Sequence, residues 1–408
     1  MSKPFGIHVS GPLEPHVPGF LDELARRGYA PWSATSYLGL MGHLSRWLSA
    51  NELAVGELTQ QLVQDFVDER RAHGYAKGRS ARGMVRVLTT YLREIGAMPD
   101  MVPSLPDTPL EWLLEEFTVY LARERGLAER TIHWCRHVAA LFLSVQGWGS
   151  SGEVGDGLQR LTADGVIAFV LAEARHRSAA SLGSVTVALR ALLRFLYAHG
   201  HTTTLLTAAV PVAPGWRDGG TSRALEQGQV VRLLDSCDRR TVSGCRDFAI
   251  LTMLARLGLR AGEVASLALD DVDWKGGEVH IVAGKGNRHD RLPLPVDVGE
   301  AMADYCHRAR PPSSYRALFL HVRAPHTALS SDAVTHIVGA ACVRAGVPRV
   351  GAHRLRHSTA TAMRRAGAPL FEIGQVLRHR HAVTTAIYAK DDRDALATVA
   401  RRWPECGA

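Results

Sequence analysis

The 408-residue sequence has few cysteines and no long apolar run, and each absence argues against a class of protein. Its cysteines form no CxxC pair and are scattered as Cys135, Cys237, Cys245, Cys306, Cys342 and Cys406. This pattern argues against a disulfide framework or a structural zinc site. No apolar stretch approaches the roughly 18 to 20 residues that cross a bilayer, and the first residues do not resemble a secretory leader. We therefore expect a soluble, cytoplasmic protein with reduced cysteines.

Excess positive charge is absent from the first half of the chain and present in the second. Residues 1–221 contain 21 basic and 21 acidic residues, whereas residues 222–408 contain 27 basic residues against 19 acidic ones. Of those 27 basic residues, 24 are arginine. The planar guanidinium binds phosphate through two hydrogen bonds, so this bias favours a nucleic-acid partner. An arginine-rich but merely solvated surface is the alternative, and charge alone leaves it open.

The first half shows no strand-like alternation, but it contains a helical pattern that occurs twice. FLDELARRG (20–28) is matched by FTVYLARERG (117–126), ELTQQLVQDFV (57–67) by RLTADGVIAFV (160–170), and VLTTYLREIG (87–96) by ALLRFLYAHG (191–200). Three matches in the same order indicate a duplicated unit of about four helices. Proline-rich residues 98–109 separate the copies, and residues 208–223 form a Pro/Gly linker. A purely structural or protein-binding pair of bundles would show the same pattern.

Two arginine pairs in these helices could face DNA phosphates. Arg82 and Arg86 lie one helical turn apart in the first copy, and Arg190 and Arg194 do so in the second. Each pair therefore shares a helix face. The solvated face of an amphipathic helix is the more common reason for such spacing, so DNA contact here is a secondary expectation.

The second half predicts a mainly helical domain with a small antiparallel sheet. A long buried helix before Gly258 is followed by a break and by a second helix from Arg260. Strands are expected near 278–283 and 289–294, joined by a GKGN turn that contains Lys285, with a further short strand at 317–320. Helices are expected near 297–309, 330–345, 352–367 and 369–378.

Several basic residues of this domain suit chemistry on a phosphodiester. Cleaving that bond places negative charge on the non-bridging oxygens and requires a proton for the leaving 5′ oxygen. Arg260 and Arg356 can bind the non-bridging oxygens. His353 precedes Arg356 by three residues and so shares its helix face. His353 and His379 can donate further hydrogen bonds, and His353 can also accept the attacking proton.

Two further residues complete this set. Lys285, at the tip of the hairpin, can protonate the leaving oxygen. Tyr388 follows His379 by nine residues and is the candidate nucleophile, which would form a covalent phosphotyrosine that conserves the bond energy. A free phenol has a pKa of about 10 and needs surrounding cations to react near neutral pH. Each residue alone would more often be structural; their joint occurrence, in order, favours the catalytic interpretation.

These motifs resemble those of the tyrosine recombinases, the integrase family of site-specific DNA recombinases. LGLRAGEVASL resembles the first arginine box, with Glu263 as the acid that supports Arg260; GKGNRHDRLPL resembles the lysine hairpin. HRLRHSTAT and LRHRHAVTTAIYAK resemble the remaining two boxes. Arg378 departs from the family, which usually has glycine before the second histidine. We expect Arg378 to lie near the scissile phosphate or to face the DNA backbone, and Arg288 of the hairpin is another candidate DNA contact.

The resemblance implies a domain order as well as an activity. The expected parts are an arm at 1–18, a core-binding-like helical repeat at 19–100, a linker at 101–109, a SAM-like core-binding domain at 110–207, a linker at 208–223 and a catalytic domain at 224–408. It implies a 3′-phosphotyrosine intermediate on duplex DNA with specific sites, a homotetramer with a dimer at each site, and no metal or other cofactor. The helix that relatives pass to a neighbouring subunit would lie at 394–403.

Three alternatives follow from the same residues. A type IB topoisomerase shares the chemistry but relaxes DNA without specific sites, and an accessory recombinase would need partner recombinases. The pairs His353/His357 and His379/His381 have a spacing that suits a metal, but no carboxylate or thiolate accompanies either pair closely. Integration, excision, resolution and transposition are all compatible with these residues.

Overall fold

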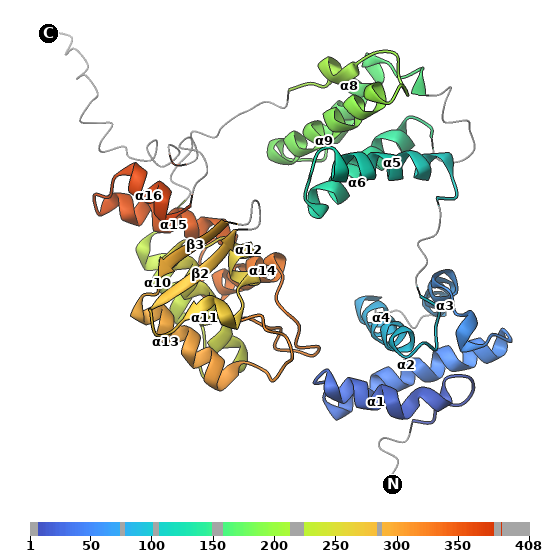
Figure 1. Cartoon of the computed structure of the whole chain (residues 1–408), viewed down its shortest axis with the longest axis horizontal. Coiled ribbons are helices and arrows are strands. Elements are labelled where there is room, and N and C mark those ends of the chain that lie inside the picture. The colour runs from blue at the N-terminus through green and yellow to red at the C-terminus, as the bar shows by residue number, and fades with distance from the viewer. Residues whose placement is uncertain are drawn as a thin grey trace. The chain divides into compact units, whose positions relative to one another are not determined.

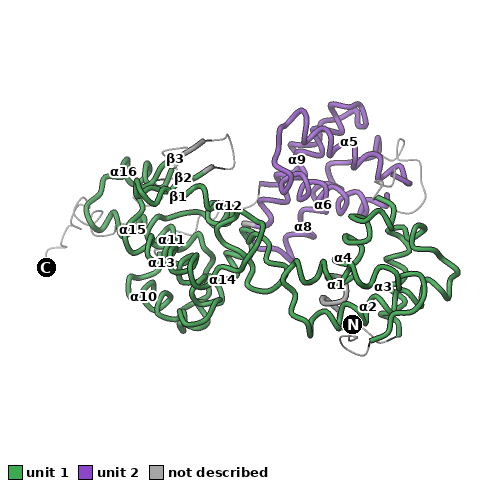
Figure 2. Tube along the Cα trace, turned by 60° about the horizontal axis from the view of Figure 1, so that its bottom comes forward, with its two compact units in different colours: residues 1–101, 221–408 green, residues 102–220 purple. Residues whose placement is uncertain are grey.

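The computed structural model describes residues 7–73, 78–100, 106–148, 158–212, 224–283, 288–378 and 385. These residues are mainly helical and include a three-stranded antiparallel sheet, which confirms the predicted fold class (Figure 1). Buried apolar side chains form three large clusters, within residues 9–98, 113–210 and 225–355. Backbone proximity divides the chain into one unit of residues 1–101 and 221–408 and another of residues 102–220 (Figure 2). The exact domain boundaries stay a prediction.

The two copies of the predicted repeat have the same succession of four described helices. The first copy contains α1 (Val17–Arg26), α2 (Pro31–Ala50), α3 (Gln60–Ala72) and α4 (Gly78–Glu94); the second contains α5 (Pro109–Arg123), α6 (Glu129–Val145), α8 (Ala163–Ala174) and α9 (Ala179–Ala198). Equivalent apolar positions are buried in both cores: Phe20, Leu24, Phe66, Leu88 and Leu92 in the first, and Phe117, Leu121, Phe169, Leu192 and Leu196 in the second. The helical repeat read from the sequence is therefore present in three dimensions.

The ends of the helices also repeat. Thr59 before α3 and Thr162 before α8 each accept a hydrogen bond from the backbone N–H three residues on, which satisfies a free donor of the first turn. Gly28 after α1 and Gly126 after α5 both adopt a positive φ, +79° and +56°, which favours glycine. The same local rules thus start and stop the helices in both copies.

Helix α9 is apolar enough over residues 181–198 to cross a membrane by length and composition. Half of that stretch is buried inside the structure, within the apolar cluster of the second helical unit. Its buried residues pack against neighbouring helices, whereas Val187 and Tyr197 are exposed. The five cysteines in the described part of the chain are free, four of them buried and Cys306 partly so, whereas Cys406 lies outside that part.

The C-terminal part is built around the buried helix α11 (Val242–Leu257), which contacts several of its neighbours. The other helices are α10 (Gln227–Asp235), α12 (Ala261–Ser266), α13 (Val296–Asp304), continued by a π-helical turn at Tyr305–Ala309, α14 (Ser331–Arg344), α15 (Ala352–Arg365) and α16 (Leu370–Val376). Helix α10 was not predicted from the sequence, and the other helices match the predicted ones to within a few residues.

The sheet has the order β1 (Val272–Asp273), β2 (Glu278–Ala283) and β3 (Arg288–Pro293), with antiparallel pairing throughout. Ala283 pairs with Arg288, and the predicted turn with Lys285 lies outside the described residues. The predicted strand at 317–320 is wrong, because this segment forms only isolated bridges, Ala268 with Ala317 and Leu320 with Ala328. Leu318, Phe319 and Leu320 are fully buried, so their apolar pattern reflects burial in the core rather than membership of a sheet.

Candidate active site

The corner between α11 and α12 positions the first candidate arginine. Helix α11 ends at Gly258, whose φ of +59° and tight surroundings both require glycine, because an added Cβ would lie 2.7 Å from Cδ2 of Leu377. Two residues later Arg260 caps α12 and begins its first turn. The Arg260 side chain is 46% exposed, so its guanidinium can reach a ligand from solvent.

Glu263 holds Arg260 in place by two contacts. Its carboxylate accepts a hydrogen bond from the Arg260 backbone N–H and another from the Arg260 guanidinium, both at 2.7 Å. The residue is 7% exposed. Burial alone would raise the pKa of Glu263, but the positive charge of Arg378, the Arg260 N–H and the Arg260 guanidinium together hold that pKa below its ordinary value. Glu263 is therefore an anion that fixes its arginine, the supporting role expected from the sequence.

Arg356 on α15 is the most deeply buried of the candidate cations in the described part, with 1% of its surface exposed. Its guanidinium donates to the carbonyl of Gly258 at 2.5 Å and to the carbonyl of Leu377. The first carbonyl belongs to the corner that leads to Arg260, and the second immediately precedes Arg378. Arg356 thus ties together two loops that are far apart in the sequence.

His353 lies one turn before Arg356 on α15, and its side chain is exposed. Desolvation by neighbouring atoms, followed by the positive charges of Arg356 and Arg260, lowers the pKa of His353 below its ordinary 6.5. Its ring meets that of His357 edge to face at 4.5 Å between centroids. A lowered pKa favours the neutral imidazole, which can accept a proton. The catalytic role of His353 stays a prediction.

Arg378 turns inward rather than toward solvent. Its side chain is 7% exposed, and its guanidinium donates to Glu263 at 2.8 Å and to the carbonyl of Val376 at 3.1 Å. The outward-facing alternative is therefore contradicted, because the guanidinium is enclosed and paired with a carboxylate. The other alternative, a place near the scissile phosphate, stays a prediction. The structure brings Arg260, Glu263, His353, Arg356 and Arg378 together.

Three predicted catalytic residues, Lys285, His379 and Tyr388, lie outside the described residues, as does the predicted helix at 394–403. Thr385 is described and is 5% exposed. An added Cβ on Gly374 of α16 would lie 2.9 Å from its hydroxyl oxygen, so Thr385 packs closely on that helix. The catalytic roles of these three residues stay predictions.

The candidate DNA-binding arginines behave differently from one another. Arg86 and Arg194 are exposed, as a phosphate contact would require. Arg190 instead donates to the carbonyl of Val210 at 2.8 Å and to that of Pro211 at 3.3 Å, so it secures the segment after the second helical unit. The side chains of Arg82 and Arg288 lie outside the described part.

Sequence reasoning missed two contributors to this site. Gly258 forms the corner between α11 and α12, and its carbonyl accepts a hydrogen bond from Arg356. Its position two residues before Arg260 could have indicated such a role. Asp290 on β3 lies 3.9 Å from Nε of Arg378 and adds a second negative charge near that arginine. Nothing in the local sequence around Asp290 indicates this pairing, because it joins residues from different elements.

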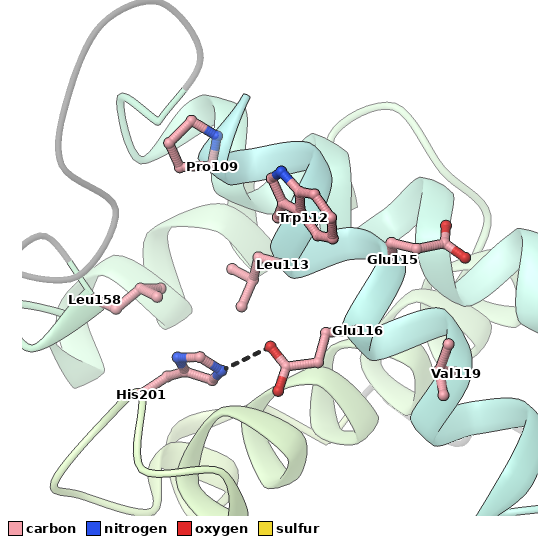
Figure 3. A pocket seen from close by; sticks show the side chains of 8 residues that line it. All are labelled: Pro109, Trp112, Leu113, Glu115, Glu116, Val119, Leu158 and His201. Carbon is pink, nitrogen blue, oxygen red and sulfur yellow. Dashed lines mark ion pairs between the residues drawn. The ribbon is translucent and has the colours of Figure 1, made fainter. Parts of the chain in front are cut away.

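A separate cavity of about 700 Å³ lies in the second helical unit (Figure 3). Its lining includes Trp112, which is 55% exposed, and His201, which points toward Glu116 with 3.3 Å between Nε2 and the carboxylate. Arg260, His353 and Arg356, the predicted catalytic residues that the structure describes, are not among its lining residues. The cavity is therefore distinct from the arginine cluster.

Three arginines, a carboxylate that binds two of them and a histidine thus lie together in a mainly helical domain with a small sheet, and Arg260 is the arginine of this cluster that is exposed to solvent. The phage integrase family model matches residues 223–394. The putative integrase/recombinase y4rA of Sinorhizobium fredii is 37% identical over 399 residues, which cover 97% of this chain and 95% of that protein.

A tyrosine recombinase, XerD of Listeria monocytogenes, is 28% identical over 280 residues, covering 68% of this chain and 93% of XerD. The fold also matches a lambda integrase tetramer bound to a Holliday junction, with a TM-score of 0.54, 17% identity, and coverage of 81% of this chain and 90% of that one. The chain belongs to the phage integrase family of tyrosine recombinases, enzymes that cleave and rejoin DNA.

Proposed function

We propose that this chain is a site-specific recombinase that cuts one DNA strand through Tyr388. The phenol oxygen attacks the scissile phosphorus, the bond to the 5′ oxygen breaks, and a 3′-phosphotyrosine and a free 5′-hydroxyl result. Attack by the 5′-hydroxyl of another strand then rejoins the DNA and releases the tyrosine. The observation that carries this proposal is the convergence of Arg260, Arg356 and His353, from α12 and α15, around one corner.

In this mechanism the arginines stabilise the transition state. Arg260 binds the non-bridging oxygens, where negative charge accumulates. Arg356 joins it by turning an N–H group toward the phosphate, because its buried guanidinium donates to the carbonyls of Gly258 and Leu377 in the structure. His353, whose pKa is lowered by desolvation and by the charges of Arg356 and Arg260, accepts the proton of the attacking phenol. Lys285 donates a proton to the leaving oxygen, and His379 adds a hydrogen bond to the phosphate. No metal ion or other cofactor is needed in these steps.

The proposed partner is duplex DNA with specific recombination sites, bound by a dimer at each site and by a homotetramer during strand exchange. The lambda integrase structure, a tetramer bound to a Holliday junction, supports this assembly by analogy. We place the reaction in the cytoplasm, on nucleoid DNA, and assign it to the integration, excision or transposition of a mobile element, with or without partner recombinases.

A suicide DNA substrate tests the central step. Candidate sites come from the DNA that flanks the gene, and a nick near the scissile phosphate traps the covalent adduct. The wild-type chain should form an adduct on Tyr388, whereas Tyr388→Phe should form none. Tyr315→Phe provides the control, because Tyr315 is 50% exposed and lies outside the cluster. An adduct with Tyr388→Phe would contradict the assignment.

A second assay separates recombination from relaxation and from accessory action. Recombination between two sites on a plasmid, by the purified chain alone, is the expected result. Relaxation of a supercoiled plasmid that lacks the site would instead indicate a topoisomerase activity. Recombination only after addition of companion proteins would indicate an accessory recombinase.

A further inference from the structure

Arg378 has a backbone conformation that its residue type disfavours. Its φ of +54° lies in the left-handed region, where a Cβ crowds the following carbonyl oxygen. Among the described residues, Glu52 is the other non-glycine residue with a positive φ. A glycine at position 378 would adopt this conformation more readily, so contacts of the arginine side chain must compensate.

Those contacts are made in an enclosed environment. The guanidinium donates to Glu263, donates to the carbonyl of Val376, and lies near Asp290 at 3.9 Å. Its Nε is shielded from solvent and has no hydrogen-bond partner within the described part of the chain. Not every N–H group of Arg378 has a hydrogen-bond acceptor there, so the attraction of two carboxylates is what holds the side chain in place.

Glu263 links Arg378 to Arg260. One carboxylate oxygen accepts from the Arg260 guanidinium, and the other accepts from both the Arg260 N–H and Arg378. Because Arg378 binds the second oxygen, the carboxylate has little freedom to rotate away from Arg260. Arg378 is 115 residues from Glu263 in sequence, so this contact joins the turn before position 379 to the start of α12.

Arg356 makes a second connection between the same two segments through the carbonyls of Gly258 and Leu377. The turn at 377–378 is therefore fixed to the corner at 258–263 twice, once through backbone carbonyls and once through a carboxylate. Loss of either connection should let the guanidinium of Arg260 move relative to a bound phosphate.

We propose that Arg378 is a positioning residue for DNA cleavage, which acts through Glu263 to hold Arg260 against the scissile phosphate. This inference rests on the proposed function. It differs from a DNA contact, because the guanidinium of Arg378 is enclosed. It also differs from a purely structural role, because loss of Arg378 should slow cleavage by protein that is still folded.

The test compares Arg378→Gly with Arg240→Ala, using the full chain and the suicide DNA substrate. Glycine accepts the positive φ, so the variant should fold, and a thermal unfolding scan checks this. Arg240 is a control for the loss of one positive charge, because its side chain is 91% exposed on the same domain and pairs only locally with Asp238. DNA affinity and the single-turnover rate of adduct formation are measured separately.

We expect Arg378→Gly to bind DNA within about twofold of Arg240→Ala and to cut about 10- to 100-fold more slowly, since small displacements of a catalytic group have effects of this size. Arg378→Lys keeps the charge and should recover part of the rate. Combining Arg378→Gly with Glu263→Gln should slow cutting no further than Glu263→Gln alone, as residues that act through one contact are not additive.

Three results would overturn the proposal: cutting by Arg378→Gly at the Arg240→Ala rate, a loss confined to DNA affinity, or full additivity with Glu263→Gln. If the wild-type chain forms no adduct on Tyr388, the proposed function fails and this inference with it. If the wild-type chain forms the adduct on Tyr388 and the Arg378 variants cut DNA as fast as Arg240→Ala, the proposed function stands and this inference fails.

Discussion

Replacing Gly258 by alanine should destabilise the α11–α12 corner more than the same change at Gly346. Both glycines have similar φ values, +59° and +63°, so each alanine incurs about 1–2 kcal/mol of left-handed strain. At Gly346 an added Cβ meets no atom within 4 Å, whereas at Gly258 it lies 2.7 Å from Cδ2 of Leu377. Leu377 is fully buried and has little room to retreat, which adds about 1–3 kcal/mol. The expected totals are about 2–5 kcal/mol at Gly258 and about 1–2 kcal/mol at Gly346.

Hydrogen exchange followed by mass spectrometry suits this comparison, because it reports on individual segments of a multidomain chain. Peptides from α11 and α15 should exchange faster in Gly258→Ala than in Gly346→Ala; each 1.4 kcal/mol of lost stability corresponds to about a tenfold increase. Cleavage of the suicide substrate should also slow in Gly258→Ala, because the Gly258 carbonyl orients Arg356.

Equal exchange in the two variants would refute this reasoning, since it would mean that strain alone matters and that the contact with Leu377 is easily relieved. Slower cutting by Gly346→Ala to the same extent would likewise show that the carbonyl of Gly258 has no particular role in positioning Arg356.

Three further predictions concern charge. Because the pKa of Glu263 is lowered, its stabilising effect is present above about pH 4.5 and is lost as the pH falls through the folded-state pKa. Chemical denaturation should therefore give Glu263→Gln a lower free energy of unfolding than wild type at pH 7, and this difference should shrink in acid. The pKa of His353 is also lowered, so the unfolded chain takes up its proton first; wild type should lose stability relative to His353→Asn as the pH drops below 6.5. Arg194→Ala should make the slope of log affinity for DNA against log salt concentration shallower by about one. Arg190→Ala should mainly loosen the segment near Val210, which limited proteolysis would detect.

The fold could be predicted from the sequence because its main signals are local. Helical spacing, capping threonines and left-handed glycines recur in both copies of the repeat, and each depends on residues within a few positions of one another. The prediction of a strand at 317–320 was wrong because strand pairing is not a local property. A short buried apolar run does not reveal whether neighbouring backbone is available for pairing.

The candidate site was predictable in its members and less so in its geometry. Arg260 and His353 were found from motif and spacing, and the structure places them near Arg356. The inward turn of Arg378 and the bonds of Arg190 to carbonyls 20 and 21 residues away depend on tertiary contacts that no local pattern encodes. A charged residue at helical spacing has the same sequence signature whether it faces solvent or secures a loop.

The shared carboxylate at position 263 has a consequence for how the chain can diverge. With two guanidiniums bound to one anion, loss of Glu263 would leave the enclosed Arg378 without its closest negative partner, which costs about 3–5 kcal/mol for a buried pair. A lineage that has acquired arginine at 378 should therefore lose it before it can replace the acid at 263. Relatives that have arginine at the position of Arg378 are therefore expected to have an acid at the position of Glu263.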